Sequence, residues 1–185
     1  MKKISRFLLC AMFVGMILTG CGKKGSELVS KTPFPDFSET TVEGETFLND
    51  IFKEYHATIV NFWNNGCGTC IEEMPELEEL YQQMKDKGVG VVGVVLDVLN
   101  EKGEAPQEDL ERAQTLVERT GVTYPVLLPD STYFNGRLTG IEAFPETFFV
   151  DKDGNIVGEP YSGSGDLEYW MSIVEKELAA VKEGA

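Results

Sequence analysis

The stretch that decides the fold runs from residue 61 to residue 70 and reads Asn-Phe-Trp-Asn-Asn-Gly-Cys-Gly-Thr-Cys. Apolar and β-branched residues from Ile59 to Trp63 predict the end of a buried strand, and the polar residues 64–66 end it. The residues from Cys70 to Lys87 are rich in Glu, Leu, Met, Gln and Lys, which favour a helix. Cys67 is therefore expected at a helix N-terminus, where free N–H groups and the helix dipole stabilise a thiolate. Cys70, one turn further on, can close onto it.

Two cysteines separated by two residues fit three kinds of site. A zinc site needs two further nitrogen or sulfur ligands, and outside the pair the chain offers only His56, Cys10 and Cys21. A purely structural disulfide would close a very short loop and would stabilise the fold little. The spacing therefore favours a reversible dithiol/disulfide couple over both alternatives.

The N-terminus has the pattern of an export signal. A basic start, Met1–Arg6, precedes an apolar run of 12 residues, Phe7–Leu18, which is too short to span a bilayer comfortably. The following Leu-Thr-Gly-Cys21 resembles the lipobox of bacterial lipoproteins, which implies cleavage before Cys21 and a diacylglyceryl thioether on its sulfur. Two acyl chains suffice for stable anchoring. The alternatives are an ordinary secretory signal, with Cys21 incidental, or an uncleaved anchor.

These patterns predict a signal peptide at residues 1–20, a lipidated tether at 21–32 and one domain at 33–185. Removing the signal from the 185 residues leaves 165, which is enough for one domain with a real core. The net charge of −15 argues against nucleic acid as a partner. Cys10 would leave with the signal and Cys21 would carry lipid, so one vicinal pair remains, unlike a disulfide-stapled scaffold.

Periodicity along the rest of the chain predicts alternating strands and helices. Two short strands should flank a turn at residues 42–45, and Asn49 or Asp50 should cap a short helix. The longer expected strands are 57–63, 89–96, 126–128 and 143–150, the last turning at 151–155 and returning at 156–157. The expected helices are 67–87, kinked by Pro75, 107–120 and 166–181, with a helical turn within 131–137. This order indicates an α/β sandwich with a mixed sheet.

The helix after the cysteines should be amphipathic. Its apolar stripe is expected to comprise Leu77, Leu80, Tyr81 and Met84. Its acidic residues Glu76, Glu78 and Glu79 lie largely off that stripe, and we expect them to face solvent.

Together these residues resemble the thioredoxin superfamily, and more specifically its membrane-tethered TlpA/ResA-like thiol–disulfide oxidoreductases. The features that carry the resemblance are Val-Asn-Phe-Trp at 60–63, the Cys-Gly-Thr-Cys pair, Pro75, and Phe-Pro-Glu-Thr-Phe-Phe-Val-Asp at 144–151 followed by Asp-Gly. The likeness covers roughly residues 33–180. It implies a thioredoxin-like three-layer sandwich, in which helices flank a mixed central sheet, with an extra N-terminal β-hairpin.

The resemblance also implies roles for individual residues. Cys67 is the exposed nucleophile and Cys70 the resolving thiol. Pro145, in a cis peptide after Phe144, faces the disulfide and helps Phe144 and Trp63 to dock an extended substrate. Without the resemblance, a trans proline opening an edge strand would be the expected form, because cis is the minority form of X-Pro bonds.

Three further positions bear on proton transfer and access. Glu73 matches a carboxylate that the family places near its cysteines and could take the proton from Cys70, three residues away on the same helix face. Because several other acids lie nearby, a Glu73 with no role is the alternative. Asn61 stands where cytoplasmic thioredoxins carry a buried aspartate, which favours Glu73 for proton handling. Gly66 replaces the aromatic residue that many relatives carry before the first cysteine, and should open the site.

The resulting prediction is an extracytoplasmic protein-disulfide reductase, anchored through Cys21 on the outer face of the cytoplasmic membrane. It needs no metal or organic cofactor. Its expected partners are disulfide-containing exported proteins and a membrane-embedded electron donor, and it is expected to be a monomer. Gly68 and Thr69 carry no positive charge to stabilise a thiolate, which favours a reductase over an oxidase.

Other functions on the same fold remain open at this point. One is a disulfide oxidase or isomerase. A thiol peroxidase would need Thr three residues before its cysteine, where this chain has Asn64. Copper delivery would call for a late histidine, whereas His56 is early and is more simply a surface residue. A non-catalytic binding module would need neither thiol. The sequence does not name the substrate.

Overall fold

The computed structural model describes residues 38–100, 102–129, 141 and 143–184. The predicted signal peptide (1–20), the lipidation site Cys21, the tether (21–32) and the helical turn within 131–137 lie outside these residues. Within the described ranges, no helix is both long enough and apolar enough to span a membrane.

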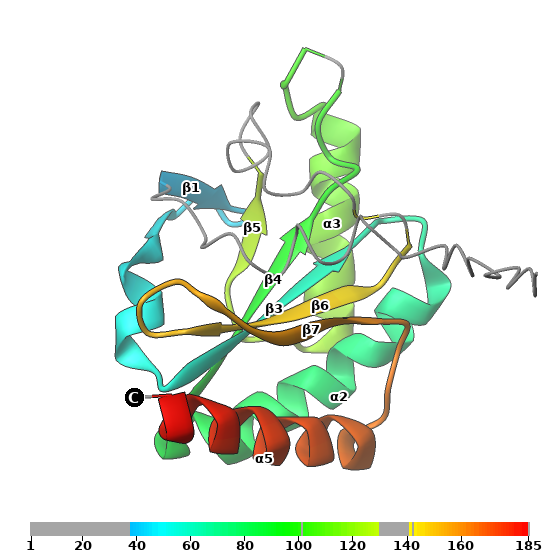
Figure 1. The fold of residues 1–185 in the computed structure, drawn as a ribbon. Helices are drawn as coiled ribbons and strands as arrows, with labels where there is room; N and C mark the ends of the chain where they lie inside the picture. The colour runs from blue at the N-terminus through cyan, green and yellow to red at the C-terminus, as the bar shows by residue number, and fades with distance from the viewer. Residues whose placement is uncertain (1–37, 101, 130–140, 142, 185) are drawn as a thin grey trace, which may run out of the picture.

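A seven-stranded mixed sheet forms the centre of the molecule (Figure 1). Its strands follow the order β2-β1-β5-β4-β3-β6-β7. Their bounds are β1 (Ser38–Thr41), β2 (Thr46–Leu48), β3 (Ala57–Trp63), β4 (Val89–Val95), β5 (Val126–Leu128), β6 (Glu146–Asp151) and β7 (Ile156–Ser162). Strands β3, β4 and β5 run parallel, whereas the β1–β2 hairpin and the β6–β7 hairpin add antiparallel edges.

In the described part of the chain, three α-helices pack on one face of this sheet: α2 (Gly68–Met84), α3 (Gln107–Thr120) and α5 (Leu167–Gly184). Figure 1 shows α2 and α5 side by side. A short 3-10 helix, η1 (Asn49–Glu54), contributes Phe52 to the opposite face, and η2 (Lys85–Lys87) ends at Gly88. Gly88 has φ +87°, a left-handed value that glycine adopts most readily, so the predicted helix stop is confirmed.

Successive side chains of each strand point to opposite faces of the sheet, which divides the core into two clusters. Ile59 and Trp63 of β3 pack toward the α-helices, whereas Val60 and Phe62 pack toward η1. Because β3 and β4 are buried on both faces, every one of their residues is buried. The predicted α/β class, mixed sheet and N-terminal hairpin are confirmed.

The register of the central strands positions the site. Strand β6 runs antiparallel to β3 and pairs Glu146 with Phe62. Pro145 therefore lies at the end of the sheet where Trp63 ends β3 and the loop to Cys67 begins. The sheet brings together two segments about eighty residues apart in the chain.

Three local expectations were wrong. Neither Asn49 nor Asp50 caps η1, whose N-cap is Leu48, without a side-chain hydrogen bond. Glu76 and Glu78 do not simply face solvent. Both are half-buried, since Glu76 accepts the backbone N–H of Leu167 and Glu78 accepts that of Thr123.

Candidate active site

Cys67 is the N-cap of α2, as the sequence predicts. Its sulfur accepts the backbone N–H of Cys70 at 3.2 Å and lies 3.5 Å from the hydroxyl of Thr69. The loop before it is closed by the N–H of Cys67, which donates to the carbonyl of Asn64. A thiolate on Cys67 would receive this N–H bond and the positive end of the helix dipole, and both favour ionisation.

The two cysteines form a disulfide and differ in accessibility. The sulfur–sulfur distance is 2.06 Å and the Cα–Cα distance is 5.3 Å. Cys67 is half-buried and borders the surface, whereas Cys70 is 1% exposed and belongs to the core. An incoming sulfur can reach Cys67 first, and Cys70 is held where only its partner can meet it.

Glu73 is a buried carboxylate one helical turn after Cys70, with 1% of its surface exposed. One oxygen accepts the N–H of Gly165 at 2.8 Å and the indole N–H of Trp170 at 2.9 Å. The other accepts an amide N–H of Asn61 at 3.1 Å. The carboxylate therefore lies at the junction of β3, α2 and α5, shielded from solvent.

Burial and hydrogen bonding act on Glu73 in opposite directions. Burial disfavours the charged form and raises its pKa, whereas the three N–H donors favour the charged form. Burial prevails and raises the pKa of Glu73 from 4.5 to about 7. A group with this pKa can both accept and release a proton near neutral pH.

Asn61 connects Glu73 to the strand that follows Pro145. Its amide nitrogen donates to Glu73 and also, at 2.9 Å, to the hydroxyl of Thr147. All three side chains are buried. An amide at this position orients the carboxylate and has no ionisable group of its own.

The Phe144–Pro145 peptide is cis, as the resemblance implies. Pro145 is buried and its carbonyl accepts the N–H of Gly163 at 2.9 Å. Phe144 is half-buried, and both it and Cys67 pack against the core that the α-helices cover.

Residues 29–165, which make up well over half of the chain, match the redoxin family. The chain belongs to the redoxin family. Among its relatives, the thiol-disulfide oxidoreductase ResA of Bacillus thuringiensis is 30% identical over 124 residues, 66% of this chain and 64% of that protein. The thiol:disulfide interchange protein DsbE of Haemophilus influenzae is 30% identical over 151 residues, 81% of this chain and 75% of that protein.

Solved structures bear out the thioredoxin-like fold of this redoxin. A thioredoxin-family thiol:disulfide interchange protein from Chlorobium tepidum superposes with a TM-score of 0.65 at 28% identity. That superposition covers 80% of this chain and 97% of the other.

The structure changes the role of one predicted residue of this redoxin. Trp63 was expected to help dock substrate, but it is 1% exposed and lies inside the core with Cys70. A side chain buried on all sides offers no surface to a substrate.

Two partners of Glu73 escaped the sequence reasoning. Trp170 and Gly165 lie more than ninety residues after Glu73 and reach it only through the packing of α5 on α2. The one available signal was a tryptophan near the start of this helix. In the described part of the chain, no group of three or more His, Cys, Asp or Glu is arranged to hold a metal ion.

Proposed function

We propose that this protein is a thiol–disulfide oxidoreductase that reduces disulfides in exported proteins, with Cys67 as nucleophile, Cys70 as resolving thiol and Glu73 as proton acceptor. The observation that carries the proposal is the graded burial along one helix turn. An accessible sulfur sits on the helix N-terminus, with a buried sulfur behind it and a buried carboxylate one turn further on.

The proposed reaction begins with the Cys67 thiolate attacking a substrate disulfide. One substrate sulfur leaves as a thiolate and a mixed disulfide forms. Cys70 then loses its proton and attacks the sulfur of Cys67, which releases the second substrate sulfur and leaves the Cys67–Cys70 disulfide. Two electrons and two protons pass to the substrate in total. A membrane-embedded donor must then reduce the pair again.

Glu73 suits the second step because the site is too buried to hold two negative charges. When Glu73 takes the proton of Cys70, the single charge moves from carboxylate to sulfur, and the net charge of the site is unchanged. The donors from Asn61, Trp170 and Gly165 hold the carboxylate in place meanwhile. Pro145 and Phe144, beside Cys67 at the same end of the sheet, are proposed to dock the substrate chain.

Two cysteine variants of the full chain test this assignment. Cys67→Ser should abolish reduction of insulin disulfides, whereas Cys70→Ser should retain the attack and accumulate a mixed disulfide visible by mass spectrometry. A Cys67→Ser protein that still reduced disulfides would overturn the proposal.

Glu73→Gln separates proton transfer from nucleophilic attack. Losing a positioned base should slow resolution of the mixed disulfide by about 100-fold or more. The initial attack by Cys67 should change little. Single-turnover kinetics resolve the two steps, and equal slowing of both would show that Glu73 only supports the fold.

Attachment of Cys21 to lipid places the domain on the outer face of the cytoplasmic membrane. This part of the proposal is supported by the sequence pattern at residues 1–21. A Cys21→Ser chain should move from the membrane fraction to the soluble one. Membrane association that survived this change would instead indicate an uncleaved anchor.

A further inference from the structure

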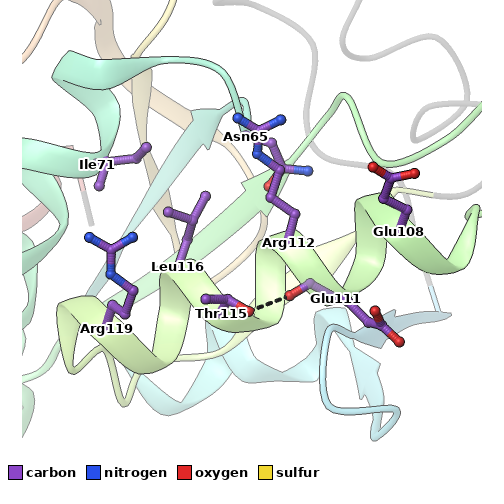
Figure 2. A pocket seen from close by; sticks show the side chains of 8 residues that line it. All are labelled: Asn65, Ile71, Glu108, Glu111, Arg112, Thr115, Leu116 and Arg119. Carbon is purple, nitrogen blue, oxygen red and sulfur yellow. Dashed lines mark hydrogen bonds between the residues drawn. The ribbon is translucent and has the colours of Figure 1, made fainter.

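A groove lies between α3 and the segment that carries the two cysteines (Figure 2). It has a volume of about 540 Å³ and is lined from the loop by Asn65, from α2 by Ile71 and from α3 by residues that include Arg112, Leu116 and Arg119. Ile71 directly follows Cys70, and Asn65 precedes Cys67 by two positions. We call it the α2–α3 groove. A chain whose cysteine reached Cys67 could continue into it.

Arg112 and Arg119 give this groove its charge. Both side chains are exposed, and in Figure 2 Arg112 extends from α3 toward Asn65 and Arg119 toward Ile71, with Leu116 between them. No ion pair joins either guanidinium to a carboxylate in the described residues. They are two of only four arginines in a chain of net charge −15, so they stand out against an acidic surface.

The acidic residues of the groove lie apart from Ile71. The carboxylate of Glu111 accepts the side-chain N–H of Gln107 at 2.8 Å, and in Figure 2 its side chain points away from Ile71. Glu108 lies at the end of the groove away from Ile71 (Figure 2). The part nearest the cysteines therefore presents positive charge above the apolar surfaces of Ile71 and Leu116.

Asn65 supplies an independent sign of a ligand. It is 4% exposed and lines the groove. Its backbone N–H donates to Asp97 at 2.7 Å and its amide N–H donates to the carbonyl of Asp109 at 3.1 Å. Its side-chain oxygen is buried and has no partner in the described part of the chain. Buried acceptors are normally satisfied, and a backbone N–H of a bound polypeptide would satisfy this one.

We propose that the α2–α3 groove binds an acidic, extended segment of the protein whose disulfide is exchanged at Cys67. The arginines lie seven residues apart on one face of α3, a rise of about 10 Å. On an extended chain in the polyproline II conformation, carboxylates three residues apart lie on one face and are separated by about 9 Å. The preferred segment therefore carries Asp or Glu at two such positions next to its cysteine, with an N–H bonded to Asn65.

This inference rests on the proposed function for its substrate, and the test uses the full chain in its reduced form. Three probes are compared. One is a peptide closed by a disulfide and followed by Glu-Ala-Ala-Glu, one is the same peptide followed by Gln-Ala-Ala-Gln, and one is a small uncharged disulfide. The variant is Arg112→Gln/Arg119→Gln. The matched control, Lys87→Gln/Lys152→Gln, removes the same charge from exposed residues at the opposite end of the sheet.

The expected result is a kcat/KM about tenfold higher for the acidic peptide than for the amide peptide, as two surface ion pairs can provide. The arginine variant should lose this preference, whereas the lysine control should keep it. All three proteins should reduce the small uncharged disulfide equally. Equal rates for the two peptides in the unaltered protein, or equal loss of preference in the lysine control, would overturn the groove proposal.

A binding measurement keeps the two proposals separate. The acidic peptide with serines in place of its cysteines should bind the unaltered protein and not the arginine variant, as followed by calorimetry. Failure to reduce any disulfide would refute the proposed function. This titration would still show whether the α2–α3 groove binds the acidic peptide. Absence of binding would count against the groove alone.

Discussion

Glu73 is the residue on which most of the chemistry depends, and its environment has a consequence for stability. The folded protein holds its proton up to about pH 7, whereas the unfolded chain releases it near pH 4.5. Burial of the neutral acid therefore contributes stability that is fully present below pH 4.5. This contribution is lost as the pH rises through about 7.

Glu73→Gln should remove this pH dependence, because the amide is neutral at every pH. The free energy of unfolding of the unaltered protein should fall by about 3 kcal/mol more than that of the variant between pH 4.5 and pH 8. Urea unfolding of the oxidised proteins across this range measures the difference. The amide also pairs poorly with the three N–H donors, but this lowers the variant's free energy of unfolding by the same amount at every pH. If the two proteins gave parallel plots of unfolding free energy against pH, the prediction would be wrong.

Two glycines should respond oppositely to alanine. Gly66, before Cys67, has no atom within 4 Å of the position a Cβ would take, and its backbone is not left-handed. Gly66→Ala should raise the free energy of unfolding by about 0.5 kcal/mol, by restricting the unfolded chain. Gly158 has φ +71°, and a Cβ there would lie 2.5 Å from a carboxylate oxygen of Glu177.

Gly158→Ala should therefore lower the free energy of unfolding by about 2 kcal/mol or more. Glu177 is buried and accepts the hydroxyl of Tyr161, so it has little freedom to move aside. Thermal and urea unfolding of both variants give the comparison. If Gly66→Ala and Gly158→Ala both shifted the free energy of unfolding in the same direction, the prediction would be wrong.

The helices α2 and α5 are joined by polar contacts as well as by apolar packing. Glu76 of α2 accepts the N–H of Leu167, the first residue of α5, at 2.9 Å. Asp166 caps the same end by accepting the N–H of Tyr169. These bonds satisfy N–H groups that a helix N-terminus otherwise leaves without partners. They also fix the end of α5 from which Trp170 reaches Glu73.

Glu76→Ala should cost about 1 kcal/mol of unfolding free energy through the loss of this cap. Glu79→Ala is the matched control, because Glu79 is an exposed glutamate of the same helix that accepts only from the nearby Gln83. That change should alter stability by less than about 0.5 kcal/mol. Equal effects of the two substitutions in urea unfolding would mean that the bond to Leu167 adds no stability.

Sequence reasoning succeeded where a pattern is local. Strand β3, the turn after it, Cys67 at a helix start, helix α3 and the hairpin after β6 all follow from neighbouring residues. The cis form of the Phe144–Pro145 bond followed from the family resemblance alone. Sequence reasoning failed where the position of one element determines the surroundings of another. The family resemblance implied that Trp63 helps to dock substrate, but a strand buried on both faces leaves none of its side chains exposed.

The same limit explains the rest of the site. Glu73 and Trp170 are 97 residues apart, and Asn61 and Thr147 are 86 apart. No periodicity within a single helix or strand predicts such pairs. The α2–α3 groove likewise needs the placement of α3 against α2, which the pattern of α3 alone does not specify.

The whole molecule combines an acidic surface with a redox pair whose two intervening residues carry no positive charge. Gly68 and Thr69 are neutral, and Glu73 lies one turn behind Cys70. Both features disfavour the thiolate form and so favour a reducing couple. The reduction potential of the Cys67–Cys70 pair should lie near or below about −250 mV.

Equilibration of the full chain with dithiothreitol buffers, followed by alkylation and mass spectrometry, measures this potential. Glu73→Gln serves as the control for the buried acid. It should make the pair less reducing, because a neutral neighbour opposes the thiolate less. A potential near about −120 mV would mean that the protein makes disulfides rather than reducing them.

The chain's two tryptophans both lie at the redox site. Trp63 shares the core with Cys70, and the indole of Trp170 is bonded to Glu73. A disulfide quenches nearby indole emission, and a carboxylate that gains or loses charge shifts it. The tryptophan fluorescence of the protein therefore comes entirely from its chemical centre. Opening of the disulfide and titration of the buried acid can be watched in real time, in unlabelled protein, as two separate optical signals.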